Sequence, residues 1–280
     1  MIVDTHAHVV APDQERYPFS SVDGVLAEAL ARRLDTEGLL DQMAGASVDR
    51  AVLVQFAHVH GYDNSYVVDS ARRHPGWVAA VCGIDSRAPD AAERLSYWVR
   101  ERGAAGLRLV AGDRGGGMDW LQVPALWQRA ADLAVPMCVF FPVGLYAPGL
   151  GALGEMLRRF PGVAVVLDHA GNPPWQEGPP LYGLGPLLDL APHNLYLKFS
   201  TVNLHRLAAA GAPAADVLKL LVDRFGAERL LWGSDLPHTP GPLGDMVGAM
   251  RAALAALPAA AQAQILGGTA LTLYPGLGPS

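Results

Sequence analysis

Apolar segments return at a nearly regular interval along this chain of 280 residues, and this interval restricts the possible folds more than any other feature. Most segments rich in Val, Ile, Leu and aromatic residues start about 27 to 35 residues after the previous one. One strand, one helix and two turns need about this much chain. The eight segments, which we expect to be strands, are residues 1–9, 51–57, 78–84, 105–110, 135–141, 163–169, 194–200 and 229–235. Eight such units predict an α/β fold, a single-domain (β/α)8 TIM barrel that covers residues 1–280.

Amphipathic patterns between the apolar segments predict the helices of these units. In residues 90–102, Asp90 is the expected N-cap, Leu95 and Val99 lie on one stripe, and Gly103 ends the pattern. We expect further helices at residues 25–40, 64–74, 121–134, 151–160, 214–226 and 243–257. A doubly wound open sheet is the alternative fold. Such a sheet usually has a glycine-rich phosphate-binding turn after its first strand, and here Asp-Thr-His-Ala-His stands in that place.

Ionisable residues end three of the predicted strands. Side chains alternate along a strand, so the even-numbered residues of the first strand are expected on one face. They are Ile2, Asp4, His6 and His8. His169 closes the sixth strand and Asp235 closes the eighth. Because the carboxyl ends of barrel strands meet at one rim, we expect the histidine pair to lie there within reach of His169 and Asp235.

Asp235 is the candidate general base, because a carboxylate close to imidazoles can orient and deprotonate water. The alternative is that Asp235 only caps the helix after Pro237. His169 is the candidate electrophilic or proton-transfer residue. Its neighbour Asp168 is expected to face the opposite way and to make a structural hydrogen bond.

Two cations on predicted strands are candidates for binding a substrate carboxylate. Arg108 suits this role because a guanidinium group can donate two parallel hydrogen bonds. Lys198 lies among apolar residues, so it needs an anion, either a substrate carboxylate or an internal partner such as Asp235. Further candidate substrate-binding residues are His60, Tyr62, Trp175 and His238. Long loops at about residues 10–38 and 171–192 leave the C-terminal ends of strands and are the expected active-site loops.

Composition argues against several kinds of partner. The chain has 21 Lys and Arg residues against 27 Asp and Glu residues, and this net charge of −6 disfavours nucleic acid. No apolar stretch is long enough for a membrane span, and we expect no secretory leader because the first strand starts at Met1. Cys82 and Cys138 fall in strands that are not neighbours, so we expect free thiols in a cytoplasmic protein. We expect a small-molecule substrate, and assembly into a homo-oligomer stays open.

Six motifs at predicted strand ends resemble the amidohydrolase superfamily. The first three are Asp-Thr-His-Ala-His at 4–8, Gln-Phe-Ala-His-Val-His-Gly-Tyr-Asp-Asn at 55–64 and Gly-Leu-Arg-Leu at 106–109. The other three are Leu-Asp-His-Ala-Gly-Asn-Pro-Pro at 167–174, Leu-Tyr-Leu-Lys-Phe-Ser at 195–200 and Gly-Ser-Asp-Leu-Pro-His at 233–238. The chain is similar to the amidohydrolase 2 (amidohydrolase-related) branch, which contains 2-pyrone-4,6-dicarboxylate lactonase and related lactonases. The resemblance runs almost end to end and departs at Thr269, where the family usually has Asn.

This resemblance implies a hydrolase that opens a lactone or related cyclic ester, of a small and carboxylated substrate, with activated water. In the superfamily a divalent metal is typically held by the first-strand histidines, by histidines of strands five and six, and by the eighth-strand Asp. A carboxylated Lys of strand four sometimes joins them. Here strand four offers Arg108, and strand five, at residues 135–142, has neither His nor Lys, so a two-metal site is not expected.

One metal ion or none is therefore expected. The ligands of one Zn²⁺ or Mn²⁺ would be His6, His8, His169 and Asp235. The same residues can also act without a metal, as the similarity to the pyrone-dicarboxylate lactonase implies, and both mechanisms stay open.

Two other functions stay open as well. The first is a metal-dependent, non-oxidative decarboxylase of an aromatic or muconate-type acid, since the same branch includes such enzymes. Their pattern normally includes a strand-five His, which this chain lacks. The second is a non-catalytic barrel, against which the joint presence of the four rim residues argues.

Overall fold

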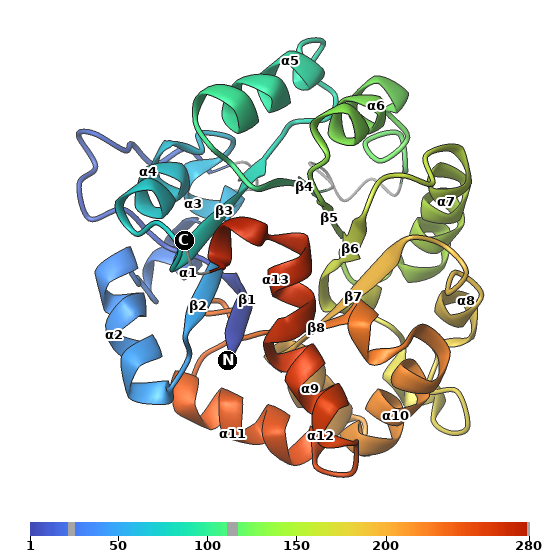
Figure 1. The fold of residues 1–280 in the computed structure, drawn as a ribbon. Coiled ribbons are helices and arrows are strands. Elements are labelled where there is room, and N and C mark those ends of the chain that lie inside the picture. Colours follow the sequence, from blue (N-terminus) through green and yellow to red (C-terminus); the bar gives the residue numbers. More distant parts are fainter. Residues whose placement is uncertain (22–25, 111–116, 279–280) are drawn as a thin grey trace.

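The structure, a computed structural model, describes residues 1–21, 26–110 and 117–278. Eight parallel strands follow one another around a barrel in sequence order (Figure 1). They are β1 (Val3–Ala7), β2 (Arg50–Val54), β3 (Val78–Gly83), β4 (Gly106–Val110), β5 (Met137–Phe140), β6 (Val165–Leu167), β7 (Leu195–Ser200) and β8 (Leu230–Gly233). The barrel closes beyond β8 through two backbone hydrogen bonds of 2.7 Å each. The Asp235 N–H donates to the His6 carbonyl, and the His8 N–H donates to the Leu236 carbonyl. The predicted single-domain (β/α)8 barrel is confirmed.

Most of the helices surround the barrel and cover its outer face, and α13 lies across one end of the barrel (Figure 1). They are α1 (Leu26–Leu30), α2 (Thr36–Ala46), α3 (Ala57–His60), α4 (Ser65–Arg73), α5 (Ala91–Ser96), α6 (Pro124–Leu133), α7 (Tyr146–Arg159), α8 (Gly185–Leu188), α9 (Thr201–Ala209), α10 (Ala214–Phe225), α11 (Leu243–Leu254), α12 (Ala259–Ala263) and α13 (Thr269–Leu273). The predicted helices at 64–74, 90–102, 121–134, 214–226 and 243–257 are confirmed, the second of them continuing from α5 into a wider π turn over Tyr97–Glu101. α7 begins at Tyr146 instead of residue 151.

Two predictions about helices are wrong. The predicted helix at 25–40 consists of the separate helices α1 and α2, because Asp35 begins a new helix. The Asp35 carboxylate accepts a hydrogen bond of 2.8 Å from the Gly38 N–H and so caps α2. Val25 lies outside the described residues. The helix α9 is absent from the sequence prediction, and it starts directly after β7, where Ser200 forms a capping box.

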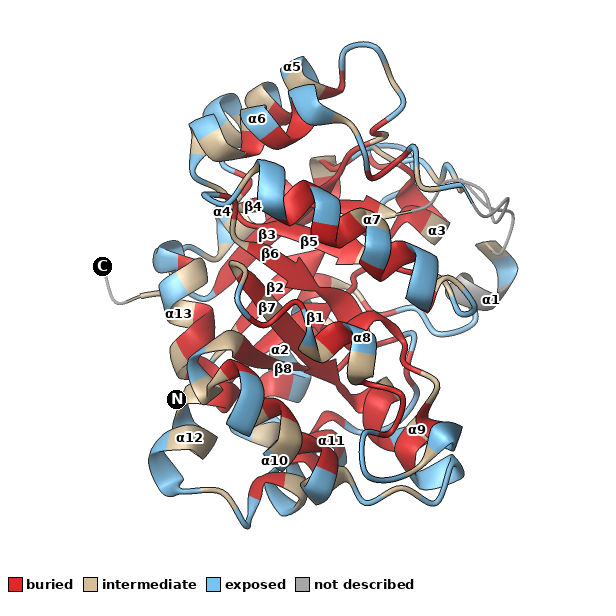
Figure 2. Cartoon of the chain, turned by 90° about the vertical axis from the view of Figure 1, so that its right-hand side faces the viewer, coloured by how far each residue is buried: buried red, intermediate tan, exposed pale blue. Residues whose placement is uncertain are grey.

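Two layers of apolar side chains hold the barrel together. Outward-facing residues such as Leu53 and Leu107 pack under the helices. Inward-facing residues such as Val81 and Val166 form a separate inner cluster, which Tyr274 after α13 closes at the N-terminal end. Figure 2 shows the strands buried throughout, with exposed residues on the outer faces of the helices. A site that needs access to solvent is therefore restricted to the C-terminal end of the barrel.

An irregularity in β1 changes which of its side chains face inward. Asp4 pairs with Ala51, but Ala7 pairs with Leu53, so β1 uses one more residue than β2 over this span. The prediction of one shared face is wrong for the first two even-numbered residues. Ile2 packs among the outward-facing apolar residues under the helices. Asp4 accepts a hydrogen bond of 2.8 Å from the backbone N–H of Ser234, the residue after β8. His6 and His8, after the irregularity, do share the inner face, as the site geometry below shows.

Cys82 and Cys138 are buried free thiols, as predicted. Among the described helices, none combines the length and the apolar character that crossing a lipid bilayer requires.

Candidate active site

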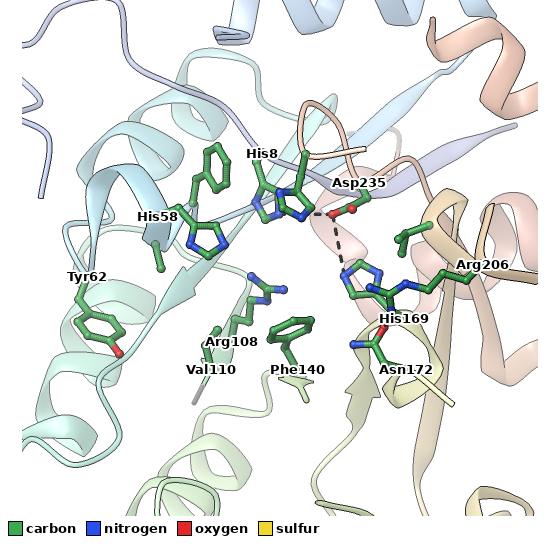
Figure 3. A pocket seen from close by; sticks show the side chains of 14 residues that line it. His8, His58, Tyr62, Arg108, Val110, Phe140, His169, Asn172, Arg206 and Asp235 are labelled. Atoms are coloured by element: carbon green, nitrogen blue, oxygen red, sulfur yellow. Dashed lines mark hydrogen bonds and ion pairs between the residues drawn. The ribbon is translucent and has the colours of Figure 1, made fainter. Parts of the chain in front are cut away.

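Four predicted catalytic side chains meet at the C-terminal rim, with Asp235 close to three imidazoles. Figure 3 shows three of the four, Asp235 with His8 and His169. The Asp235 Oδ1 atom lies 3.6 Å from His6 Nε2, 3.8 Å from His8 Nε2 and 3.9 Å from His169 Nε2. Its Oδ2 atom accepts a hydrogen bond of 2.7 Å from the Thr239 hydroxyl. All four rim residues are buried. The structure thus brings together the side chains selected from the sequence, and their chemical roles remain a prediction.

Left-handed backbone turns aim two of these side chains into the barrel mouth. His169 has φ 54° and Asp235 has φ 66°, conformations that non-glycine residues rarely adopt. Such a backbone costs about 1–3 kcal/mol and clusters at functional sites. The prediction that Asp168 faces away from His169 is wrong for this reason. Asp168 follows the alternation of β6 and points inward like Val166, and His169 turns inward because the strand has ended.

Hydrogen bonds on the far ring nitrogen hold two of the imidazoles in place. His8 Nδ1 lies 2.8 Å from the Val54 carbonyl, and His169 Nδ1 lies 2.5 Å from the Ser200 hydroxyl. The His8 ring also stacks on Phe56, with 4.7 Å between the ring centroids. In both histidines the Nε2 atom is left to face Asp235.

Burial shifts the protonation of these groups in a direction that suits base catalysis. Burial raises the pKa of Asp235 to about 7, although the Thr239 hydrogen bond and the charge of Arg108 act against this shift. Burial lowers the pKa of His6 to about 3 and lowers the pKa values of His8 and His169 well below their usual range. At neutral pH the imidazoles are therefore uncharged, and the carboxyl group can both take up and release a proton.

A buried charge network lies beneath the rim. The Asp168 Oδ2 atom accepts a hydrogen bond of 2.8 Å from Arg108 Nε. The Asp168 Oδ1 atom lies 2.9 Å from Lys198 Nζ. Burial opposes the charge of Asp168, yet Lys198 and Arg108 hold the pKa of this carboxyl well below its usual range. The assignment of Lys198 to substrate binding is wrong, because its ammonium is fully buried on this partner. Lys198 instead forms an internal ion pair, and its partner is Asp168 and not Asp235.

A cleft enclosing about 740 Å³, its open mouth included, leads to Asp235. Of the predicted substrate-binding residues, Arg108, Tyr62 and His238 line it. His60 and Trp175 are not among the residues that line it. The His60 ring accepts a hydrogen bond from the Ala11 N–H, and Trp175 packs edge-on against Phe199.

Several cleft residues were absent from the sequence prediction. They are Phe56, Ala57, Val110, Phe140, Asn172, Val202 and Arg206. Arg206 is the most informative of them, because it adds a second guanidinium group to the cleft. It lies on α9, and predicting a helix directly after β7 would have placed it at this rim.

The two predicted active-site loops contribute unequally. The loop at about 171–192 supplies Asn172 to the cleft wall. The loop at about 10–38 supports the wall from behind, since Arg32 donates a hydrogen bond of 2.7 Å to the His238 carbonyl. Residues 22–25 of that loop lie outside the described part of the chain.

Three of the four predicted ligands could hold one divalent cation. Ligand atoms of His6, His169 and Asp235 lie within 4.8 Å of one another, and His8 is not part of this group. Imidazole nitrogens and a carboxylate oxygen are donors suited to Zn²⁺. His6 Nε2 is buried and has no hydrogen-bond partner in the described part of the chain. At the same rim β4 and β5 present Arg108 and Phe140, which are not metal ligands.

A (β/α)8 barrel with this arrangement of histidines and aspartate at its rim defines an enzyme of the amidohydrolase superfamily. The chain belongs to the amidohydrolase family, because the model of this family matches residues 3–276. The resemblance found in the sequence motifs is confirmed.

Relatives of this chain include lactone hydrolases. It is 30% identical over 255 residues to the L-fucono-1,5-lactonase of Burkholderia ambifaria, covering 87% of this chain and 83% of the relative. It is 25% identical over 241 residues to the 4-sulfomuconolactone hydrolase of Hydrogenophaga intermedia, covering 84% of this chain and 74% of the relative. A solved amidohydrolase structure from Burkholderia multivorans with bound zinc is 24% identical, with a TM-score of 0.76, covering 98% of this chain and 99% of that chain.

Proposed function

We propose that this enzyme hydrolyses a lactone or a related cyclic ester of a small, carboxylated substrate. The observation that carries the proposal is Asp235, a buried carboxyl with a pKa raised to about 7, placed between three neutral imidazoles at the end of an open cleft. The lactone hydrolases among the relatives support this substrate class. The two guanidinium groups in the cleft, of Arg108 and Arg206, suit a carboxylate on the substrate.

In the proposed mechanism, Asp235 removes a proton from water as the water oxygen attacks the lactone carbonyl. Of the imidazoles of His6, His8 and His169, one that carries its proton on Nε2 can donate to the carbonyl oxygen and stabilise its developing negative charge. The ring C–O bond then breaks, and the proton held by Asp235 passes to the leaving alkoxide oxygen. The product is an open-chain hydroxy acid, and the carboxylate of Asp235 is regenerated.

A divalent ion bound by His6, His169 and Asp235 would supply Lewis-acid polarisation of the carbonyl. We expect at most one such ion per chain, held loosely enough for a chelator to remove, because β4 and β5 add no ligands at this rim. Metal content per chain, measured by mass spectrometry before and after chelator treatment, checks this expectation. Two tightly held ions per chain would contradict it.

A panel of lactones tests the proposed function. Sugar-acid lactones, muconolactones and pyrone dicarboxylates are offered with and without Zn²⁺ or Mn²⁺, and acid release is followed with a pH indicator. Aromatic and muconate-type acids are assayed in parallel for release of CO2. Hydrolysis of a lactone supports the proposal. Decarboxylation without hydrolysis supports the alternative enzyme, and no turnover in either assay supports the non-catalytic barrel.

Arg206→Met is expected to raise KM for a carboxylated lactone roughly 10- to 100-fold, because the loss of one charge-assisted hydrogen bond weakens binding by about this factor. The effect on kcat should be smaller, because the contact exists in the ground state and in the transition state alike. Arg251→Met, at an exposed position of α11, is the matched control. An equal rise in KM for an uncharged lactone would show that Arg206 shapes the cleft without binding the carboxylate.

We further propose that the protein acts in the cytoplasm on a small molecule, without a nucleic-acid partner. The net charge of −6 supports the last point.

A further inference from the structure

The ring nitrogen of His6 that faces away from the cleft lies in an unusual environment. His6 Nδ1 is 3.1 Å from Lys198 Nζ and 3.4 Å from Asp168 Oδ1. Lys198 Nζ is in turn 2.9 Å from the same Asp168 oxygen. All three side chains are fully buried, so no bulk water separates these atoms.

The two neighbours of Nδ1 demand opposite protonation of the ring. The Lys198 ammonium can only donate, and it therefore needs a lone pair on Nδ1. Asp168 could accept a proton from Nδ1, but 3.4 Å lies outside the usual range of 2.7–3.2 Å for an N–H···O hydrogen bond. A proton on Nδ1 would also point two donors at each other across 3.1 Å in a dry interior. The distances favour the hydrogen bond from Lys198.

We infer that Lys198 is a positioning residue that holds His6 in the tautomer with its proton on Nε2. His6 then presents an N–H group to the cleft, 3.6 Å from Asp235 Oδ1 and without a hydrogen-bond partner in the described part of the chain. His8 has the opposite arrangement, because its Nδ1 donates to the Val54 carbonyl and leaves a lone pair on Nε2. The two histidines of the pair thus offer one donor and one acceptor.

This inference goes beyond the proposed function and assigns a different task to each histidine in it. The His6 N–H is a donor for the carbonyl oxygen of the substrate as negative charge develops there. It also has a consequence for metal binding. A metal ligand needs a lone pair on Nε2, and metal-bound histidines usually donate from the other nitrogen to an acceptor. Lys198 therefore weakens metal binding through His6.

The tautomer can be observed directly in the wild-type protein. Histidine labelled with ¹⁵N gives separate NMR signals for protonated and unprotonated ring nitrogens, and a His6→Asn variant identifies those of His6. In chelator-treated protein at pH 8 we expect the proton on Nε2 and none on Nδ1. A proton on Nδ1 would overturn the inference. This result does not depend on whether any lactone is hydrolysed, so it tests the inference independently of the proposed function.

A variant tests whether Lys198 is the cause. In Lys198→Met, Asp168 becomes the only partner of Nδ1, so the proton should move to Nδ1 and the affinity for Zn²⁺ should rise roughly tenfold or more. Affinity is measured by competition with a chromophoric chelator. Lys219→Met removes the exposed lysine of α10 and is the matched control, for which we expect wild-type affinity. Equal zinc affinity in wild type and Lys198→Met would overturn the role of Lys198. If Lys198→Met does not fold, the wild-type NMR measurement decides the inference alone.

Discussion

Asp235→Asn is expected to lower kcat by roughly two to four orders of magnitude on any lactone that the wild-type enzyme hydrolyses. The amide matches the carboxyl group in size, and its oxygen can still accept the Thr239 hydrogen bond of 2.7 Å. It cannot, however, take a proton from water. The imidazoles and the cleft stay in place, so the substrate should still bind and KM should change much less than kcat. Steady-state kinetics, with circular dichroism as a check on folding, measures both quantities.

The pH profile gives a second readout of the same residue. Asp235 must be ionised to act as a base, and burial raises its pKa to about 7. Wild-type kcat/KM should therefore increase as the pH rises through about 7 and then level off, and Asp235→Asn should lack this rise. Asp245→Asn, on the exposed face of α11, serves as the control and should behave as wild type. Near-full activity of Asp235→Asn would instead point to His169 as the base.

The largest loss of stability is expected from Asp168→Asn. This carboxylate is the shared partner of Lys198 and Arg108, and the Lys198 ammonium is fully buried. Removing one partner of a buried ion pair typically costs about 3–5 kcal/mol, because the remaining charge loses its compensation away from water. Guanidinium unfolding in the presence of a chelator measures the free energy of unfolding without any contribution from a bound metal.

Two comparisons separate the ion pair from other effects of that substitution. The double variant Asp168→Asn, Lys198→Met should recover much of the lost stability, since it removes the uncompensated ammonium as well. The exposed pair of Lys219 and Asp223 is the matched surface control, and Asp223→Asn should cost at most about 1 kcal/mol. A loss in Asp168→Asn no greater than in Asp223→Asn would show that the buried network contributes little to stability.

The sequence by itself determined the architecture and the position of the rim residues. The interval between apolar segments reflects the length of a β-α unit, which depends on local geometry and not on distant contacts. His6, His169 and Asp235 stand at strand ends, and parallel strands in a barrel bring those ends to one rim. Their convergence could therefore be predicted without knowing any side-chain contact.

Only the tertiary structure decided the inward turn of His169, the partner of Lys198 and the presence of Arg206 in the cleft. Strand alternation predicts direction only while a strand is regular, and both the irregularity in β1 and the left-handed turn at His169 end that regularity. A buried ammonium takes the carboxylate that lies nearest in space, and the 2.9 Å between Lys198 and Asp168 results from how separate strands are placed around the barrel. Distances between segments far apart in the chain are set by packing, and no local pattern in the sequence records them.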